Sequence, residues 1–272
     1  MSLTYIYRIP RFIIRKFVEA IRSLSWNYGL ISLHHKHKNK LLKLKNKHKG
    51  KPCVIIGGGP SLKKMNINRF KTHITIGCNA FYLLGNKYNF YPDYYTVEDP
   101  LPAVDNRDQI NSLKKTIKII PLDLKKIISD GENTIYVNFK RSSIYYKNKN
   151  FPLYSDCFDE RSFWGGTVLY FNIQLAQYLG CNPIKLVGVD LDYKIPKNIT
   201  KNGNVLTSKE DDQNHFDPQY FGKGKKWHLP EVDRMQKAFD KAYQNTRKSN
   251  IDLVNSGLDG NLKNIPRDET FS

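Results

Sequence analysis

The chain has 272 residues, of which 40% are hydrophobic and 12% aromatic, and its mean hydropathy is -0.56. That length and composition suit one folded α/β unit with a terminal appendage and exclude a wholly disordered chain. No run of about 18 uninterrupted apolar residues occurs, which argues against a membrane-spanning helix.

The net charge of +19 is concentrated at one end of the chain. Residues 1–51 contain 13 Lys and Arg residues against a single acid, Glu19, so this segment carries +12 and the other 221 residues carry only +7. The basicity therefore belongs to an N-terminal arm, and we do not expect the body to bind nucleic acid.

The arm begins with a predicted amphipathic helix over residues 11–26. Its apolar side is formed by Ile13, Ile14, Phe17, Ile21 and Leu24. A basic helix with such a side can lie on an anionic membrane. Packing of the same side on the body or on a second copy is the alternative, so self-association stays open. Residues 34–51, with histidines among lysines and no nearby acid or cysteine, predict a basic linker and no metal site. The arm and linker together span residues 1–50.

The four cysteines have no paired C-x-x-C spacing, so we expect reduced thiols. Arg11, Arg15 and Lys16 interrupt the N-terminal apolar residues, which is unlike a secretory signal. With the membrane-binding arm, these features predict a cytoplasmic protein, peripheral to the inner face of the bacterial cytoplasmic membrane.

Residues 51–272 alternate short apolar runs with helical stretches. This pattern predicts a Rossmann-like α/β domain with a largely parallel sheet and flanking helices. The expected strands are 53–56, 74–77, 94–97, 117–120, 135–138, 184–189 and 251–254, and the main expected helices are 106–115, 167–179 and 231–248. The polar, weakly periodic segment of about 194–226 is predicted to be a lid near the site.

A glycine turn follows the first expected strand: Gly57, Gly58 and Gly59 precede Pro60 and Ser61. Such a turn lets backbone N–H groups approach an anion at the start of a helix, which favours a phosphate or nucleotide. It is neither a Walker motif nor a dinucleotide fingerprint, and an ordinary tight turn is the alternative.

Polar residues also follow other expected strands. They are Asn79 after 74–77, Glu98 and Asp99 after 94–97, and Asp190 and Asp192 around the end of 184–189. Trp164, Gly165, Gly166 and Thr167 open a helix. Because ligands of parallel sheets bind at the carboxyl ends of the strands, these groups predict one shared site.

The motifs IIGGGPSL (55–62), CNAFY (78–82), WGGT (164–167) and IKLVGVD (184–190) resemble the 6-hydroxymethylpterin diphosphokinase MptE-like family. That family is similar in turn to the small bacterial CMP-sialic acid-dependent sialyltransferases. The resemblance covers residues 51–255 and leaves the arm outside.

In those sialyltransferases the glycine turn, the Asn of the CN motif and a later helix start hold the CMP moiety. The resemblance therefore implies nucleotide contacts at Gly57, Gly58, Gly59, Pro60, Ser61, Asn79, Gly165, Gly166 and Thr167. Asp99 stands where the family has Asn before Pro, so the resemblance implies either that Asp99 faces the sugar or that the donor differs. Asp190 and Tyr220 are further expected substrate contacts.

The sialyltransferases use a His before a long helix as general base, which makes His228 the match and His215 the second candidate. Imidazole suits this task because its ordinary pKa lies near neutral pH. Asp190 and Asp192 are spaced like the D-x-D of metal-dependent glycosyltransferases. The resembling sialyltransferases need no metal, so none is expected here.

The expected function is an inverting glycosyltransferase that moves a sialic acid- or Kdo-like sugar from a CMP-activated donor to a cell-surface glycan or glycolipid acceptor, as in lipopolysaccharide or capsule biosynthesis. No cofactor is required beyond the donor substrate. Two alternatives stay open: a 6-hydroxymethylpterin pyrophosphokinase-like enzyme using ATP and Mg²⁺, and a non-enzymatic module that binds through its arm.

Overall fold

The computed structural model describes residues 11–141, 151–196 and 198–271. Residues 1–10 of the expected arm and residue 197 of the expected lid lie outside the described residues. A seven-stranded sheet in the order β12-β8-β1-β2-β3-β4-β5 forms the centre, and every neighbouring pair is parallel. Its strands are β1 (Cys53–Ile56), β2 (Ile74–Cys78), β3 (Tyr94–Thr96), β4 (Ile117–Pro121), β5 (Thr134–Val137), β8 (Ile184–Val187) and β12 (Leu253–Asn255). The predicted Rossmann-like α/β fold is confirmed.

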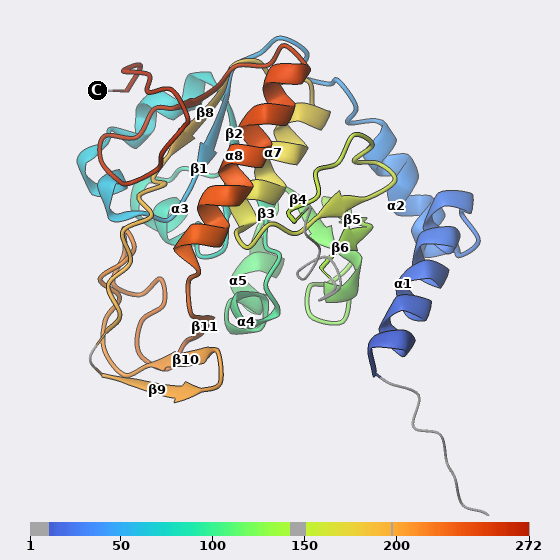
Figure 1. The fold of residues 1–272 in the computed structure, drawn as a ribbon, viewed down its shortest axis with the longest axis horizontal. Coiled ribbons are helices and arrows are strands. Elements are labelled where there is room, and N and C mark those ends of the chain that lie inside the picture. The colour runs from blue at the N-terminus through green and yellow to red at the C-terminus, as the bar shows by residue number, and fades with distance from the viewer. Residues whose placement is uncertain (1–10, 142–150, 197, 272) are drawn as a thin grey trace, which may run out of the picture.

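The strands of this sheet are almost entirely buried, because helices cover both faces of a parallel sheet and each strand can be a continuous apolar run. The connecting helices are α3 (Tyr82–Tyr88), α4 (Pro100–Asp105), α5 (Arg107–Ser112), α7 (Val168–Tyr178) and α8 (Val232–Lys248), with 3-10 helices at Pro60–Lys64, Ile67–Thr72 and Leu122–Leu124. Helices α7 and α8 lie side by side in front of the sheet (Figure 1). The predicted helix at 106–115 is shorter than expected, and α4 precedes it.

The strand order reverses at β1, which lies between β2 and β8. From β1 the chain continues through β2 towards β5 on one side, and from β8 it continues to β12 on the other side, so a crevice is expected at the carboxyl ends of β1 and β8. The glycine turn follows β1 directly, and Gly188 to Asp190 follow β8. The topology thus brings two of the polar strand ends predicted from the sequence to one place.

The N-terminal arm is an αα-hairpin, α1 (Arg11–Tyr28) and α2 (Ser32–Leu42), on the flank of the sheet (Figure 1). The prediction of a linker over 34–51 is wrong, because α2 packs along the edge strand β5 and buries His34, His37 and Leu41. The Tyr136 amide of β5 donates to His37 Nδ1 at 3.2 Å, and Lys40 Nζ donates to the Gly131 and Glu132 carbonyls. The helix therefore covers an edge that would otherwise expose unpaired backbone groups.

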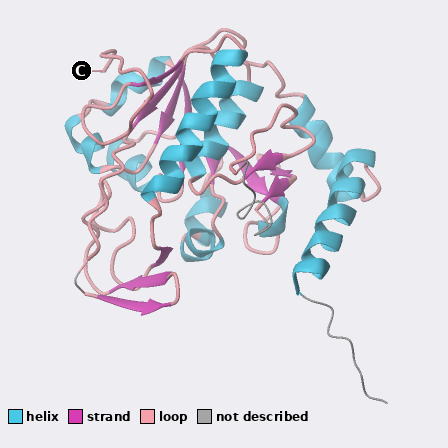
Figure 2. Cartoon of the chain, in the orientation of Figure 1, coloured by secondary structure: helices cyan, strands magenta, loops and turns pink. Residues whose placement is uncertain are grey.

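The expected lid contains a small antiparallel sheet of β9 (Ile199–Asn202), β10 (Val205–Ser208) and β11 (Lys226–His228). It extends beyond the central sheet, on the side away from α1 and α2 (Figures 1 and 2). A second short pair joins β6 (Phe139–Lys140) to β7 (Ser162–Phe163) beside β5. Within the described part of the chain, no helix combines the length and apolar character needed to cross a bilayer.

Candidate functional site

The glycine turn at the end of β1 is hydrogen-bonded to the end of β8. The Gly57 amide donates to the Val187 carbonyl and the Gly59 amide to the Gly188 carbonyl, both at 2.8 Å. A Cβ on Gly57 would come well inside 3.0 Å of the Gly188 carbonyl oxygen, so no other residue fits here without a backbone shift. Two of the backbone N–H groups that were predicted to bind an anion are thus hydrogen-bonded within the protein.

The buried Asp190 carboxylate lies at the start of the helix that follows the turn. Its Oδ2 accepts from the Ser61 amide at 2.8 Å, and its Oδ1 accepts from the Ser61 hydroxyl at 2.5 Å. Gly59 lies against the same carboxylate, closer than any side chain could. The side chain of Asp190 therefore occupies the place at this helix start where a phosphate is predicted. Asp192, two residues later, is exposed.

The lid segment is folded over the turn. The Phe216 amide donates to the Gly58 carbonyl at 2.9 Å, and the rings of His215 and Tyr220 stack at 4.0 Å beside Gly58. His215 is buried, and its Nδ1 lies 2.7 Å from Asp212 Oδ2. Although burial acts to raise it, the pKa of Asp212 is lowered by this hydrogen bond and charge.

Between the turn and the lid remains a cavity of about 40 Å³. Its lining includes Gly58, Gly59, Thr167, Asp190 and His215. That volume suits one or two water molecules rather than a nucleotide. The structure thus brings the predicted turn, the start of α7 and one candidate base together, with the lid closed over them.

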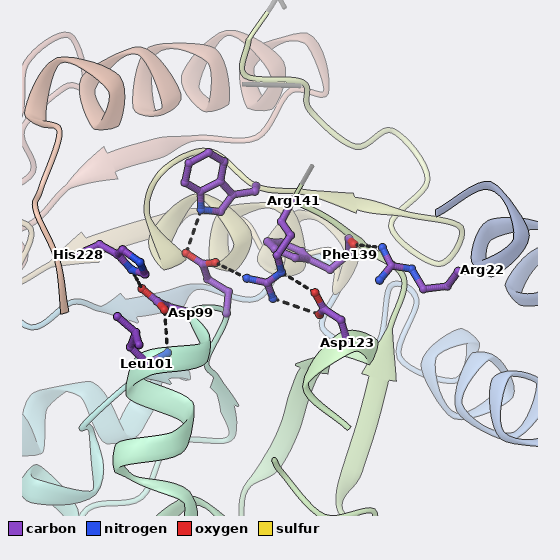
Figure 3. A network of polar contacts seen from close by, with 9 residues as sticks. Arg22, Asp99, Leu101, Asp123, Phe139, Arg141 and His228 are labelled. Carbon is purple, nitrogen blue, oxygen red and sulfur yellow. Dashed lines mark hydrogen bonds and ion pairs between the residues drawn. The ribbon is translucent and has the colours of Figure 1, made fainter. Parts of the chain in front are cut away.

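His228 forms a second cluster with Asp99. Its Nδ1 lies 2.6 Å from Asp99 Oδ2, and the other oxygen of Asp99 caps α4 by accepting from the Leu101 amide at 2.9 Å (Figure 3). The hydrogen bond to Asp99 raises the pKa of His228, against the opposing effect of partial burial. About half of the His228 side chain is exposed, and its Nε2 has no hydrogen-bond partner within the described part of the chain.

Strand β11 holds His228 over α4. The Lys226 amide donates to Asp105 at 2.8 Å, and Lys225 Nζ donates to Asn106 Oδ1 at 2.8 Å and to the Tyr82 hydroxyl at 3.0 Å. His228 itself pairs with Val205 in the small sheet. The imidazole is therefore positioned by the lid on one side and by the cap of α4 on the other.

Beside this dyad, Glu98 lies buried at the end of β3. Its carboxylate accepts from Trp164 Nε1 at 3.2 Å and from Arg141 at 3.4 Å, and Arg141 also binds Asp123 at 2.6 Å (Figure 3). Burial raises the pKa of Glu98 to about 7, although the Arg141 charge opposes this. Glu98 is thus a buried carboxyl group, next in sequence to Asp99, whose pKa lies near neutral pH.

The remaining predicted contacts lie around the two clusters. Asn79 has a left-handed backbone, with φ of 51°, and its Oδ1 is buried without a hydrogen-bond partner. Burial raises the pKa of Tyr220 well above its ordinary value, while a hydrogen bond with Asn79 acts in the opposite direction. Thr167 caps α7 by accepting from the Leu169 amide at 3.3 Å, after Gly166 with φ of 88°. The nucleotide roles of these residues stay predictions.

Two residues that were predicted separately, Asp99 and His228, are paired in the structure. Asp99 was expected to face a sugar, and its two oxygens are held by His228 and the backbone of α4. Arg141 and Asp123 were not predicted, because nothing in their local sequence marks them. The two candidate bases each have an Asp at Nδ1, but only His228 is substantially exposed.

A larger cavity of about 770 Å³ lies elsewhere, at the amino ends of β2, β3 and β4. Lys71, Asp93, Lys114 and Thr116 are among its lining residues. None of the predicted site residues lines it, so we place the candidate site at the opposite edge, where the two clusters lie.

Comparisons with known proteins agree with this architecture. A family model described as 6-hydroxymethylpterin diphosphokinase MptE-like matches residues 30–196. The structure of the MAf glycosyltransferase from Magnetospirillum magneticum AMB-1 is similar over 88% of this chain, with a TM-score of 0.50 and 16% identity. The likeness covers 39% of that protein's chain, and at this identity it concerns the fold alone. No relative was found among the curated proteins.

Proposed function

The chain belongs to the 6-hydroxymethylpterin diphosphokinase MptE-like family, and we propose that it uses this fold as a glycosyltransferase. In this proposal it transfers a sialic acid- or Kdo-like sugar from a CMP-activated donor to a glycan or glycolipid acceptor, with inversion. The fold likeness to a solved glycosyltransferase supports the reaction class. The choice of donor and acceptor rests on the resemblance of the sequence motifs to the CMP-sialic acid-dependent sialyltransferases.

The His228–Asp99 pair is the observation that carries this proposal. With Asp99 ionised, Nδ1–H of His228 donates to it, which leaves the lone pair of Nε2 open to an acceptor hydroxyl. Nε2 takes the hydroxyl proton as the oxygen attacks the anomeric carbon, and the bond from that carbon to the CMP phosphate oxygen breaks. Asp99 stabilises the imidazolium that forms and acts as a positioning residue.

Donor binding requires the lid to move. The cavity of about 40 Å³ under His215 and Phe216 cannot hold a nucleotide, and the contacts that close it are one backbone hydrogen bond and ring packing on Gly58. Lid opening is a common step of substrate admission in enzymes. The donor phosphate would then meet the backbone N–H groups at the start of α7. Asn79 Oδ1, which is buried without a partner, would accept from a hydroxyl or amino group of the nucleotide.

A thermal-shift experiment tests the proposal. CMP without a divalent metal is expected to raise the melting temperature by several degrees at a concentration about 100-fold above its Kd, which adds about 2.7 kcal/mol of stability. The variant His228→Ala is expected to keep this shift and to lose sugar transfer by about 10²- to 10⁴-fold. A missing CMP shift, or unchanged transfer by His228→Ala, would contradict the proposal.

The family description itself favours a second candidate, an ATP- and Mg²⁺-dependent pyrophosphokinase. Magnesium requires carboxylate oxygens that are open to it. Four carboxylates at this edge do not fit that need, because Glu98 and Asp123 share Arg141, Asp99 holds His228 and Asp190 holds Ser61. Asp192 is exposed, and it is the carboxylate that this candidate would use. A melting shift with ATP that depends on Mg²⁺, with none from CMP, would establish this candidate instead.

A further inference from the structure

Helix α1 presents an apolar surface to the outside of the molecule. Seven apolar side chains along it are between 45% and 74% exposed: Ile13, Ile14, Phe17, Val18, Ile21, Leu24 and Tyr28. At 100° per residue they cover one continuous side of the helix. We call these seven residues the α1 apolar face.

The opposite side of α1 attaches to the body through mostly polar contacts. Arg22 donates to the Phe139 carbonyl at 2.8 Å, Lys140 Nζ donates to the Ser23 hydroxyl, and the buried Trp26 donates through Nε1 to the Asp159 carbonyl at 2.7 Å. A surface helix normally buries its apolar side and leaves its polar side in water. Here the orientation is reversed, and a contiguous exposed apolar patch marks an interaction surface.

The positive charge of the N-terminal arm indicates which kind of surface the α1 apolar face binds. The sequence of α1 contains Arg11, Arg15, Lys16 and Arg22 against Glu19 alone, and residues 1–51 carry +12. Two copies meeting through α1 would bring like charges together. Ala20 and Asn27, which flank the apolar spacing, offer no opposite charges for pairing between helices. An anionic lipid surface accepts the apolar face and attracts the net positive charge of residues 1–51.

We propose that α1 lies in the headgroup layer of an anionic membrane, with the α1 apolar face turned into the acyl region. Each apolar side chain removed from water contributes to this binding, and the basic residues add attraction that falls with salt. The proposal rests on the orientation of α1 and is independent of the reaction catalysed.

The same contacts tie the membrane face to the candidate site. Phe139 and Lys140 of strand β6 form hydrogen bonds with residues of α1. The next residue, Arg141, forms ion pairs with Glu98 and Asp123 (Figure 3). A molecule anchored by α1 would therefore hold its candidate site in a fixed relation to the lipid surface.

Co-sedimentation of the full-length protein with vesicles tests the proposal. The protein is expected to pellet with vesicles of phosphatidylglycerol and phosphatidylcholine, and binding to phosphatidylcholine alone should be weaker. The double variant Phe17→Glu/Ile21→Glu is expected to lower the partition coefficient at least about tenfold. The matched control is Val104→Glu/Ile195→Glu, which places the same charges on two equally exposed apolar residues away from α1 and should leave binding unchanged.

Circular dichroism and the melting temperature of the double variant show whether it folds. Equal vesicle binding by the folded double variant and the wild type would overturn the proposal. So would a wild-type protein that does not pellet but forms a dimer in sedimentation velocity, with the double variant monomeric, because a second copy would then be the occupant.

Discussion

His228 and His215 show how one residue type takes two different places in the molecule. Each has an aspartate at Nδ1, yet His215 is buried within the lid and stacked on Tyr220, while His228 is half exposed above α4. Only an imidazole with an accessible Nε2 can take a proton from an acceptor hydroxyl. Accessibility therefore favours His228 as the base.

The raised pKa of His228 predicts a pH profile. A general base must be unprotonated, so kcat/KM for sugar transfer is expected to rise with pH through a pKa above 6.5. Asp99→Asn removes the hydrogen bond and charge that raise this pKa, so the acid limb should move to lower pH. The maximal rate should also fall, because Asn does not hold the productive tautomer.

Asp108→Asn is the matched control for Asp99→Asn, since Asp108 is a largely exposed carboxylate on α5 that pairs with Arg107. Its profile should match the wild type. An Asp99→Asn profile with an unchanged acid limb would show that Asp99 does not set the protonation of the base.

At the scale of elements, the glycine turn is a joint between β1 and β8. Two amide-to-carbonyl bonds and the Asp190–Ser61 contacts hold the strand ends together at the reversal of the sheet order. This turn resembles a phosphate-binding motif, but its conformation is held by hydrogen bonds to other residues of the protein. Its glycines are needed for close packing whether or not a nucleotide binds.

Gly57→Ala tests that close packing. The added Cβ would clash with the Gly188 backbone, so the free energy of unfolding should fall by about 1–3 kcal/mol or more. Urea denaturation measures this change. Gly131→Ala is the control, because its nearest neighbour to an added Cβ is a side-chain atom at 3.7 Å and its stability should change little. Equal stability of the two variants would show that the turn adapts freely.

At the scale of the whole molecule, the arm is part of the fold as well as a candidate membrane anchor. Helix α2 covers the edge of β5, and Trp26 and Leu41 are fully buried. Removal of residues 1–50 would therefore expose a sheet edge, so point variants on α1 separate membrane binding from folding better than truncation does.

The buried His37 makes arm docking sensitive to acid. Burial lowers the pKa of His37 to about 4, so between pH 6.5 and pH 4 the unfolded chain binds a proton that the folded chain does not. Stability should therefore be lost as the pH falls through this window, by up to about 3 kcal/mol. In urea denaturation the variant His37→Gln is expected to lose that part of the pH dependence.

His35→Gln controls for the loss of a histidine, because His35 lies exposed on the same helix. It should keep the wild-type pH dependence. Identical slopes for His37→Gln and His35→Gln between pH 4 and pH 6.5 would contradict the role of His37.

The central sheet could be predicted from the sequence, because a continuous apolar run such as 53–56 is typical of a strand that is covered on both faces. It also located the glycine turn and the two candidate bases. Helix α2 was missed because its buried histidines and alternating lysines resemble a solvated linker.

Which polar groups contact one another could be seen only in the folded chain. Asp190 reaches Ser61 and His228 reaches Asp99 across 129 residues of chain in each case, and neither pairing has a local signal. The outward direction of the α1 apolar face was equally hidden, since periodicity defines a face but not what it turns toward. Contacts between distant segments depend on strand order and packing, and these arise from the whole chain.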